Sequence, residues 1–326
     1  MMPEHDAQTD SHTLAVGRSD RHDPAALPEA VAGGTVTAPR PVTPALLRTW
    51  PLPSPGGSKY DRGHVMVVGG ARATPGAVML AGTAALRMGA GKLGLAVARS
   101  VAGHVAVAVP ESGVFGLDED ADGSVTGHGI DDSLGAQVSR ADAVLIGPGL
   151  DAIDGSERLL EEIMPLLPDS ACIVLDAFGA TALPRLDPRV LEALAGRLVL
   201  SPNPRELAYL LDRDDAGEHL GAAVLECAER YGAAVGCGTL VAWEGALWEI
   251  TTGDTGLGTS GSGDVVAGAM TGLLSRGASP VQALVWAKHV HAQAGEELAA
   301  RFGRVGYLAG ELGAQLPRVM ATLGGD

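Results

Sequence analysis

One short segment of the sequence combines the residue types that hold a phosphate group. Residues 258–264 read Gly-Thr-Ser-Gly-Ser-Gly-Asp and directly precede an apolar stretch, 265–270, whose pattern predicts a helix. Glycines let the backbone curl so that successive N–H groups point into one concavity, and the start of a helix adds about half a positive charge there. Asp264 could take a proton from a hydroxyl group at the same place. We therefore predict that this turn binds a nucleotide phosphate and that Asp264 takes part in the chemistry.

A simpler interpretation of Asp264 is a helix N-cap, because a carboxylate at that position bonds free backbone N–H groups. Capping explains a single Asp or Ser. It does not explain glycines at positions 258, 261 and 263. The spacing therefore favours a binding turn over a plain cap.

Two more glycine-rich turns follow predicted strands. Gly69-Gly70 ends the first strand and precedes a predicted helix, and Gly147-Pro148-Gly149 ends a later strand. In doubly wound α/β folds, ligands bind at the carboxyl ends of the strands. Each turn alone fits an ordinary connection, and the first lacks the dinucleotide-binding spacing. Together with residues 258–264 they indicate one binding site at strand ends.

Polar groups close two further strands. Asp176 follows an apolar run and could bind a Mg²⁺ water or a ligand hydroxyl, or could simply bond nearby amides. Asn203 and Glu206 have the spacing of a helix capping box, in which Glu lies three residues after the cap. A ligand-binding role and a capping role both remain open for this pair.

No metal site built from protein side chains is predicted. His289 and His291 are two residues apart on a predicted helix, so they point to different faces, and we expect each to be a core or surface histidine with satisfied hydrogen bonds. The three cysteines have no metal-ligand spacing; they are Cys172, Cys227 and Cys237.

The composition excludes several classes of partner. The 326-residue chain has a formal net charge of -16 and only 3% aromatic residues. An acidic surface repels nucleic acid and anionic membranes, and few rings are available to stack on bases. Residues 1–20 contain no apolar run, so they resemble neither a signal peptide nor a membrane anchor. We expect a cytoplasmic protein that binds neither nucleic acid nor membrane.

The elements that must position the turns alternate short β-branched runs with longer Ala- and Leu-rich stretches. This alternation predicts an α/β fold with a mostly parallel central sheet and helices on both faces. A turn at Glu244-Gly245 predicts an antiparallel hairpin at the edge of the sheet. The predicted strands are 64–68, 93–98, 143–146, 171–176, 198–200, 240–243 and 248–250, and the predicted helices are 75–88, 156–166, 188–195, 203–211, 216–231, 262–275 and 279–302.

The first part of the chain differs from the rest. Residues 1–42 are rich in Asp, His, Thr, Ala and Pro without hydrophobic periodicity, and we expect a disordered leader outside the fold. The ordered part begins near Val42, where Thr43 caps a short helix that has Pro44 at its first position. No repeat or linker divides the remainder of the chain, which predicts one domain over residues 43–326.

The order of these motifs resembles that of the ADP/ATP-dependent NAD(P)H-hydrate dehydratases, which have a ribokinase-like fold. The resemblance covers about residues 43–322. It is carried by residues 58–63, 67–70, 75–77, 84–91, 147–150, 258–264 and 316–317.

The resemblance implies a repair reaction on NADH or NADPH that has taken up water across a ring double bond. ADP or ATP, with Mg²⁺, phosphorylates the ring hydroxyl, and phosphate then leaves, driven by the lone pair of the ring nitrogen. In this role Asp264 takes the hydroxyl proton, and the turn stabilises the transferred phosphoryl group. The resemblance further implies a homo-oligomer.

It also assigns binding residues by motif position. The residues implied to contact the hydrated cofactor are Ala77, Gly149, Asn203 and Asp264. Those implied to bind the nucleotide are Gly236, Cys237, Gly238, Thr239, Gly261, Ser262 and Gly263.

Three positions depart from the family pattern. The family often has His-Pro-Gly-Glu where this chain has Asn-Pro-Arg-Glu at 203–206, and Lys-Gly where this chain has Val235-Gly236. It usually has Asp-Ala-Asp where this chain has Asp-Ala-Phe at 176–178. Loss of a lysine contact to phosphate typically weakens binding roughly ten- to a hundredfold. We hypothesise that the forked cation of Arg205 partly replaces it.

Two other functions fit the same sequence. A small-molecule kinase of the ribokinase-like group would use the same turn and Asp264 to phosphorylate a stable alcohol. A nucleotide-binding paralogue without catalysis would explain the three departures.

Overall fold

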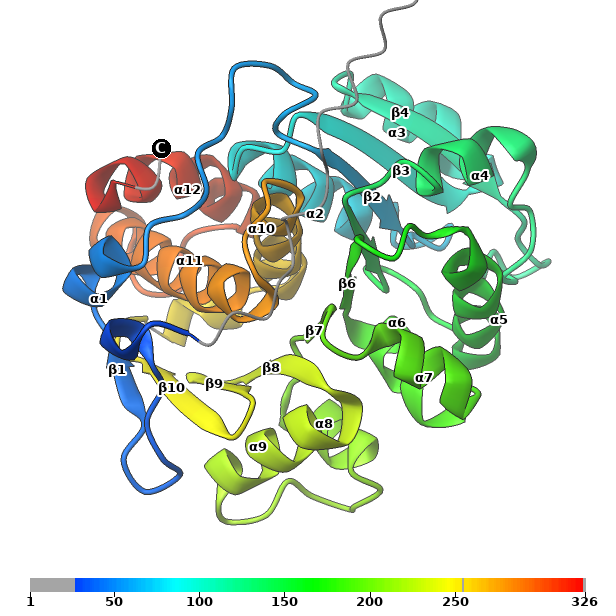
Figure 1. The fold of residues 1–326 in the computed structure, drawn as a ribbon. Helices are drawn as coiled ribbons and strands as arrows, with labels where there is room; N and C mark the ends of the chain where they lie inside the picture. Colours follow the sequence, from blue (N-terminus) through cyan, green and yellow to red (C-terminus); the bar gives the residue numbers. More distant parts are fainter. Residues whose placement is uncertain (1–26, 254, 325–326) are drawn as a thin grey trace, which may run out of the picture.

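The computed structural model describes residues 27–253 and 255–324. Among these residues, ten strands form one central sheet with helices packed on both sides (Figure 1). The strands are β1 (Arg40–Val42), β2 (His64–Val68), β3 (Lys92–Ala98), β4 (Ser112–Leu117), β5 (Ala143–Ile146), β6 (Cys172–Leu175), β7 (Leu198–Leu200), β8 (Ala233–Cys237), β9 (Leu240–Trp243) and β10 (Ala246–Ile250).

The order of the strands across the sheet is β1-β10-β9-β8-β7-β6-β5-β2-β3-β4. Every pair is parallel except β8 with β9 and β9 with β10, which are antiparallel. From β2 the chain first runs outward through β3 and β4, and it then returns to the other side of β2 with β5. The boundary between β2 and β5 is therefore the topological switch point, where open α/β sheets bind ligands beyond the carboxyl ends of the strands.

Two apolar layers separate the sheet from its helices. On one face, the buried side chains of the sheet pack against α1 (Pro44–Thr49), α2 (Pro75–Arg87), α3 (Ala102–Ala108), α10 (Ser262–Ser275), α11 (Pro280–Phe302) and α12 (Ala309–Leu323). On the other they pack against α4 (Asp132–Val138), α5 (Ile153–Ile163), α6 (Ala177–Thr181), α7 (Pro188–Leu194), α8 (Pro204–Leu210) and α9 (Leu220–Tyr231). The α/β class with a mostly parallel sheet, as predicted, is confirmed.

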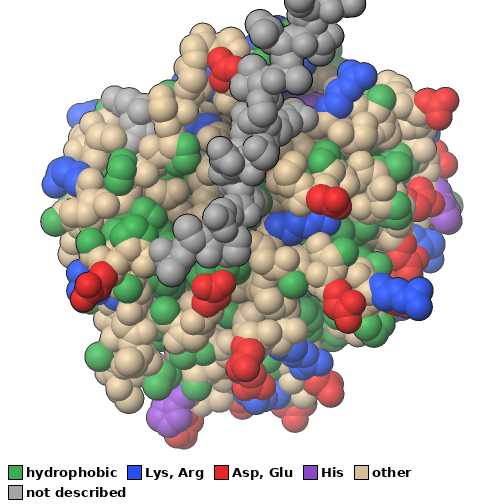
Figure 2. Space-filling model, viewed as in Figure 1, with side chains coloured by type: hydrophobic (Ala, Val, Ile, Leu, Met, Phe, Trp, Pro, Cys, Tyr) green, Lys and Arg blue, Asp and Glu red, His purple; other side chains and the backbone are tan. Residues whose placement is uncertain are grey.

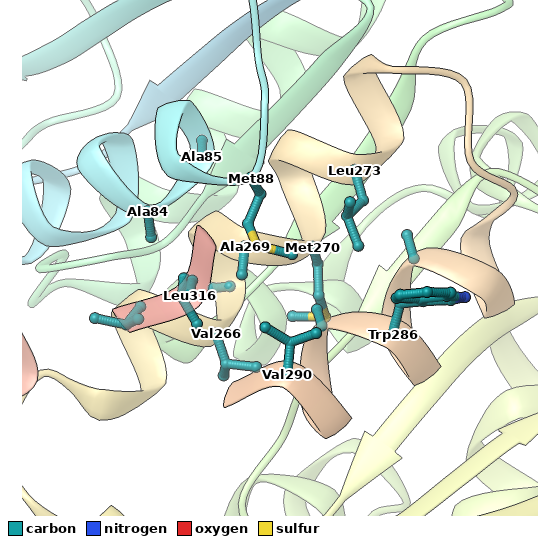
Figure 3. Close-up of a cluster of buried hydrophobic side chains, with 14 of the residues drawn as sticks. Ala84, Ala85, Met88, Val266, Ala269, Met270, Leu273, Trp286, Val290 and Leu316 are labelled. Carbon is teal, nitrogen blue, oxygen red and sulfur yellow. The ribbon is translucent and has the colours of Figure 1, made fainter. Parts of the chain in front are cut away.

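The first layer is centred on α10. Figure 3 shows Met270 and Leu273 of α10 beside Met88, which follows α2, and Trp286 and Val290 of α11. All five side chains are at most 1% exposed. Because α10 is enclosed by α2, α11 and α12, its amino-terminal end is held at one place above the sheet.

Most predicted elements are present. Strands β1, β4 and β8 and helices α3, α4, α6 and α12 were not predicted. The stretch from Ala233 to Cys237 is a fully paired strand, β8, between β7 and β9. Its sequence, Ala-Ala-Val-Gly-Cys, is poor in the β-branched and aromatic residues that mark strands. Pairing on both sides decides its conformation. The hairpin predicted at Glu244-Gly245 is confirmed, with positive φ at both residues, and it joins β9 to β10. Its predicted place at the edge of the sheet is wrong, because β1 pairs with β10 and forms the edge.

The predicted boundary of the leader is wrong for residues 27–42. Strand β1 pairs with β10, Gly34 exchanges backbone hydrogen bonds with Leu247, and the indole N–H of Trp248 donates to the carbonyl of Val31 at 3.1 Å. These contacts are far apart in sequence and leave no local periodicity to detect. The helix predicted after Val42 is confirmed, because the Thr43 hydroxyl accepts from the N–H of Leu46. Residues 1–26 lie outside the described part.

The visible surface mixes charges of both signs. Figure 2 shows acidic and basic side chains interspersed on this face of the molecule. Within the described residues, no helix is both long and apolar enough to cross a membrane.

Candidate active site

The turn at residues 258–264 leads into α10, as the sequence predicts. Gly261 is the N-cap, in a left-handed conformation with φ of 86°, and the helix begins at Ser262. Asp264 lies in the first turn of the helix, and its carboxylate makes no capping hydrogen bond. The simpler N-cap interpretation of Asp264 is therefore wrong, and its side chain is available for another partner.

The glycines of this turn divide into two kinds. Gly261 needs its positive φ, and a Cβ there would also lie 2.6 Å from a methyl group of Leu80. A Cβ built on Gly258 or Gly263 would meet no atom within 4 Å, and neither residue has a positive φ. Nothing in the described structure requires glycine at these two positions. Open space beside backbone N–H groups at a helix start is what an approaching phosphate needs.

Two carboxylates with raised pKa values, Asp264 and Asp176, lie near the amino-terminal end of α10. Burial raises the pKa of Asp264 to about 6. Burial, followed by the negative charges of Glu206 and Asp264, raises the pKa of Asp176 to about 7. Such values are typical of groups that exchange protons near neutral pH. The effect of these two charges on the pKa of Asp176 indicates that the end of β6 faces the first turns of α8 and α10.

The backbone after β6 is strained. Ala177 directly follows Asp176 and has a φ of 46°, in the left-handed region that favours glycine. On the neighbouring strand, a Cβ at Gly147 would lie 1.8 Å from the carbonyl oxygen of Asp176, so glycine is required there. Backbone strain of this kind clusters at functional sites. The close packing of Gly147 fixes the position of the backbone at Asp176.

The two other glycine-rich turns meet at the switch point of the sheet. The N–H of Gly70 donates to the carbonyl of Pro148, and the N–H of Ala71 donates to that of Gly149, both at 2.8 Å. A Cβ on Gly149 would lie 3.1 Å from the Cβ of Ala77. The structure thus brings together Ala77 and Gly149, the pair that the resemblance implies in binding the hydrated cofactor.

Helix α2 connects this pair to the phosphate turn. Ala77 lies in its first turn, and Leu80 lies three residues later on the same side. Leu80 is the residue that Gly261 contacts. The pair Ala77 and Gly149 and the turn before Asp264 therefore lie on either side of the first turns of α2.

Asn203 has a structural role that the sequence left open. Its side chain accepts from the N–H groups of Arg205 and Glu206, and the Glu206 carboxylate accepts from the N–H of Asn203 at 2.9 Å. This capping box starts α8, and both Asn203 and Arg205 are exposed. The capping interpretation is confirmed, while contact of Asn203 with a ligand stays a prediction.

The implied nucleotide-binding segment lies at the carboxyl end of β8. Gly236 and Cys237 are buried in the strand, and Gly238 and Thr239 form the exposed turn to β9. A Cβ on Gly236 would lie 3.0 Å from Cδ of Lys288. Sequence reasoning missed Lys288. The signal was one lysine in the stretch 280–292 of α11, which contains no other Lys, Arg, Asp or Glu and packs on β8.

His291 joins α11 to the phosphate turn. Its Nε2 atom is hydrogen-bonded to the Ser262 hydroxyl at 3.0 Å, and both side chains are buried. Burial, then the charge of Lys288, lowers the pKa of His291 to about 4, so its ring is neutral at neutral pH. His289 is fully buried in the core, but neither of its ring nitrogens has a hydrogen-bond partner among the described residues, so the expectation of a satisfied histidine is wrong there. The expectation that His291 is only a core histidine is incomplete, because it holds the first residue of α10.

Comparison with known proteins shows the family to which this chain is related. The family model described as NAD(P)H-hydrate dehydratase matches residues 65–318. The ADP-dependent (S)-NAD(P)H-hydrate dehydratase of Xanthomonas campestris is 43% identical over 292 residues, which cover 87% of this chain and 97% of that protein. The bifunctional NAD(P)H-hydrate repair enzyme of Escherichia coli is 32% identical over 278 residues, covering 82% of this chain. The chain spans only 49% of that enzyme's length.

Solved structures show the same fold. A ribokinase-like superfamily protein from Enterococcus faecalis superposes with a TM-score of 0.75 at 20% identity, covering 87% of this chain and 96% of the other. The ADP/ATP-dependent NAD(P)H-hydrate dehydratase of Bacillus subtilis, co-crystallized with ATP/Mg²⁺, gives 0.68 at 23% identity, with 86% and 97% covered. The fold is therefore ribokinase-like. From the matched family model and the Xanthomonas relative, the chain belongs to the NAD(P)H-hydrate dehydratase family.

Proposed function

We propose that this protein removes water from hydrated NADH or NADPH at the expense of an adenine nucleotide. The observation that carries the proposal is the position of Asp264. It has a half-buried carboxylate without a capping partner, in the first turn of α10 and behind two glycines that leave open space. A base beside an anion site is what phosphoryl transfer to a hydroxyl group requires.

In this mechanism the cofactor binds against Ala77 and Gly149, with its ring hydroxyl directed toward Asp264. Asp264 accepts the hydroxyl proton as the oxygen attacks the terminal phosphoryl group of the nucleotide. Backbone N–H groups at Gly261 to Gly263 stabilise the charge that develops on that group. The lone pair of the ring nitrogen then expels inorganic phosphate from the phosphate ester, and loss of a proton from the neighbouring ring carbon restores the double bond.

The name of the Xanthomonas relative supports ADP as the phosphoryl donor, and we propose it for this chain. Mg²⁺ would shield the phosphate charges when it is bound with the nucleotide. Carboxylate oxygens are the ligands it prefers, and Asp176 and Asp264 are the residues that would hold it. We also propose a cytoplasmic location and a homo-oligomer, both as implied by the sequence.

The test is an assay with purified protein, hydrated NADH or NADPH, and ADP or ATP, in which absorbance reports the restored reduced cofactor. We expect turnover with at least one nucleotide. Asp264→Asn should lower kcat by about a hundredfold or more, since general-base catalysis is typically worth 10²–10⁴-fold. Its affinity for the nucleotide should remain within a few-fold of wild type.

The alternatives give different results in the same assay. A stable phosphorylated product that does not eliminate phosphate would identify a small-molecule kinase instead. Nucleotide binding without turnover in either form would identify a paralogue that has lost catalysis.

A further inference from the structure

Helix α11 carries one cation in its buried part. Residues 280–287 and 289–292 are all buried, and Lys288 between them is partly buried. Within residues 27–253 and 255–324, the Lys288 ammonium group forms no hydrogen bond and no ion pair. Withdrawing an ammonium group from water is costly unless an anion compensates for it. The described protein supplies no anion in direct contact.

The side chain of Lys288 runs along the end of β8. Its Cδ atom would lie 3.0 Å from a Cβ at Gly236, so glycine at that position leaves the path of the stem open. The ammonium group is close enough to Cys237 and Asp176 for both to oppose the lowering of the Lys288 pKa by burial. The stem of Lys288 therefore passes the carboxyl end of β8 on the face of the sheet that α10 and α11 cover.

Lys288 also lies next to the phosphate turn. His291 is three residues later on the same side of α11, and it is bonded to Ser262 at the start of α10. One face of α11 thus contacts both segments that the resemblance assigns to the nucleotide, residues 236–239 and residues 261–263. A phosphate chain reaching from one segment to the other would pass over Lys288.

We propose that Lys288 binds a phosphate oxygen of the adenine nucleotide, and so supplies from α11 the positive charge that Val235 leaves missing from β8. Val235 itself is fully buried in the apolar layer under α8 and α9. The proposal rests on the proposed function, because it needs a nucleotide in this site. It assigns the role to Lys288 in place of Arg205, whose side chain is exposed.

The test compares Lys288→Met and Lys288→Arg with wild type by calorimetric titration with ADP and by the KM for each substrate. Methionine keeps the length of the stem without the charge. We expect ADP affinity to fall ten- to a hundredfold in Lys288→Met and to recover partly in Lys288→Arg. The KM for the hydrated cofactor should stay within twofold. Lys92→Met is the matched control, because Lys92 is exposed at the opposite, amino end of β3.

The outcomes separate the two proposals. Wild-type protein that neither binds ADP or ATP nor turns over would refute the proposed function. Wild-type binding with an unchanged ADP affinity in Lys288→Met would refute the role of Lys288 alone, and so would a rise confined to the KM of the hydrated cofactor. If Lys288→Met does not fold, Lys288→Gln gives the same comparison, with thermal unfolding as the check of its structure.

Discussion

The proposed chemistry of this site depends on one carboxylate, Asp264, that makes no capping hydrogen bond in the described structure. At the start of a helix, Asp normally bonds free N–H groups, yet Gly261 occupies the cap and Asp264 lies in the first turn beyond it. Burial holds the pKa of Asp264 at about 6. A base with this pKa is ionised at neutral pH and still accepts a proton readily.

The pKa of Asp264 predicts the acid side of the pH profile. The active form is the carboxylate, so kcat/KM should fall about tenfold per pH unit as the pH drops below about 6. Initial rates from about pH 4.5 to 8 at low substrate concentration measure this limb. A profile that stays flat down to about pH 4.5 would contradict the assignment of Asp264 as the base.

Asp176 predicts a change of stability with pH. Its pKa is raised to about 7 in the folded protein from 3.8, so the folded state binds this proton more tightly than the unfolded chain does. Ionisation of Asp176 therefore destabilises the folded protein as the pH rises from about 4 to about 7. The destabilisation is complete above about pH 7 and absent below about pH 4. Asp176→Asn should raise the free energy of unfolding by roughly 1–3 kcal/mol at pH 8, and by less at pH 5.

Urea unfolding at both pH values measures this difference. Asp122→Asn is the control, because Asp122 is exposed and should give no change at either pH. Lower stability of Asp176→Asn at pH 8 would show that the carboxylate is compensated in the fold.

At the scale of elements, some glycines of α10 allow close helix packing, and another is proposed to leave space for the ligand. A Cβ on Gly268 would lie 2.0 Å from the carbonyl oxygen of Ala81, and one on Gly272 would lie 2.5 Å from that of Ala85. These glycines let α10 approach α2 at backbone distance. Gly263, in the first turn of the same helix, has only open space beside it.

Alanine at each site should separate these two tasks. Gly268→Ala should lower the free energy of unfolding by roughly 1–3 kcal/mol, because the methyl group forces the helices apart. Gly263→Ala should fold as well as wild type or slightly better, since alanine favours a helix by up to about 1 kcal/mol. It should nevertheless bind ADP more weakly, because the methyl group occupies space meant for phosphate. Unfolding curves and ADP titrations measure both; unchanged ADP affinity in Gly263→Ala would remove Gly263 from the site.

At the scale of the whole molecule, the sheet is completed by residues that precede the first predicted helix. Strand β1 covers β10, and Val31 and Val42 are fully buried in the layer with Trp248. The loss of this segment would expose β10 as an edge and leave the Trp248 indole N–H without its acceptor.

A truncation measures the contribution of this segment. A chain that begins at residue 43 should unfold at a lower temperature and aggregate more readily than a chain that begins at residue 27. Thermal unfolding and light scattering of the two chains make the comparison, which isolates residues 27–42. Equal unfolding temperatures would show that β1 adds nothing to the fold.

The sequence by itself determined the local features of this protein. Gly261 and Asp264 belong to one turn, Thr43 caps its own helix, and Asn203 with Glu206 forms a box over four residues. Such features are visible in sequence because the interacting groups are close along the chain. The order of the glycine-rich turns, which indicated the family, is likewise a property of the linear sequence.

Only the tertiary structure decided which distant groups meet. Strand β8, with its low β propensity, forms because β7 and β9 pair with it on both sides. Lys288 lies 52 positions after Gly236, and the two meet only because α11 packs on β8. The proposed role of Lys288 depends on the packing of a helix on a strand, which residue types alone do not reveal.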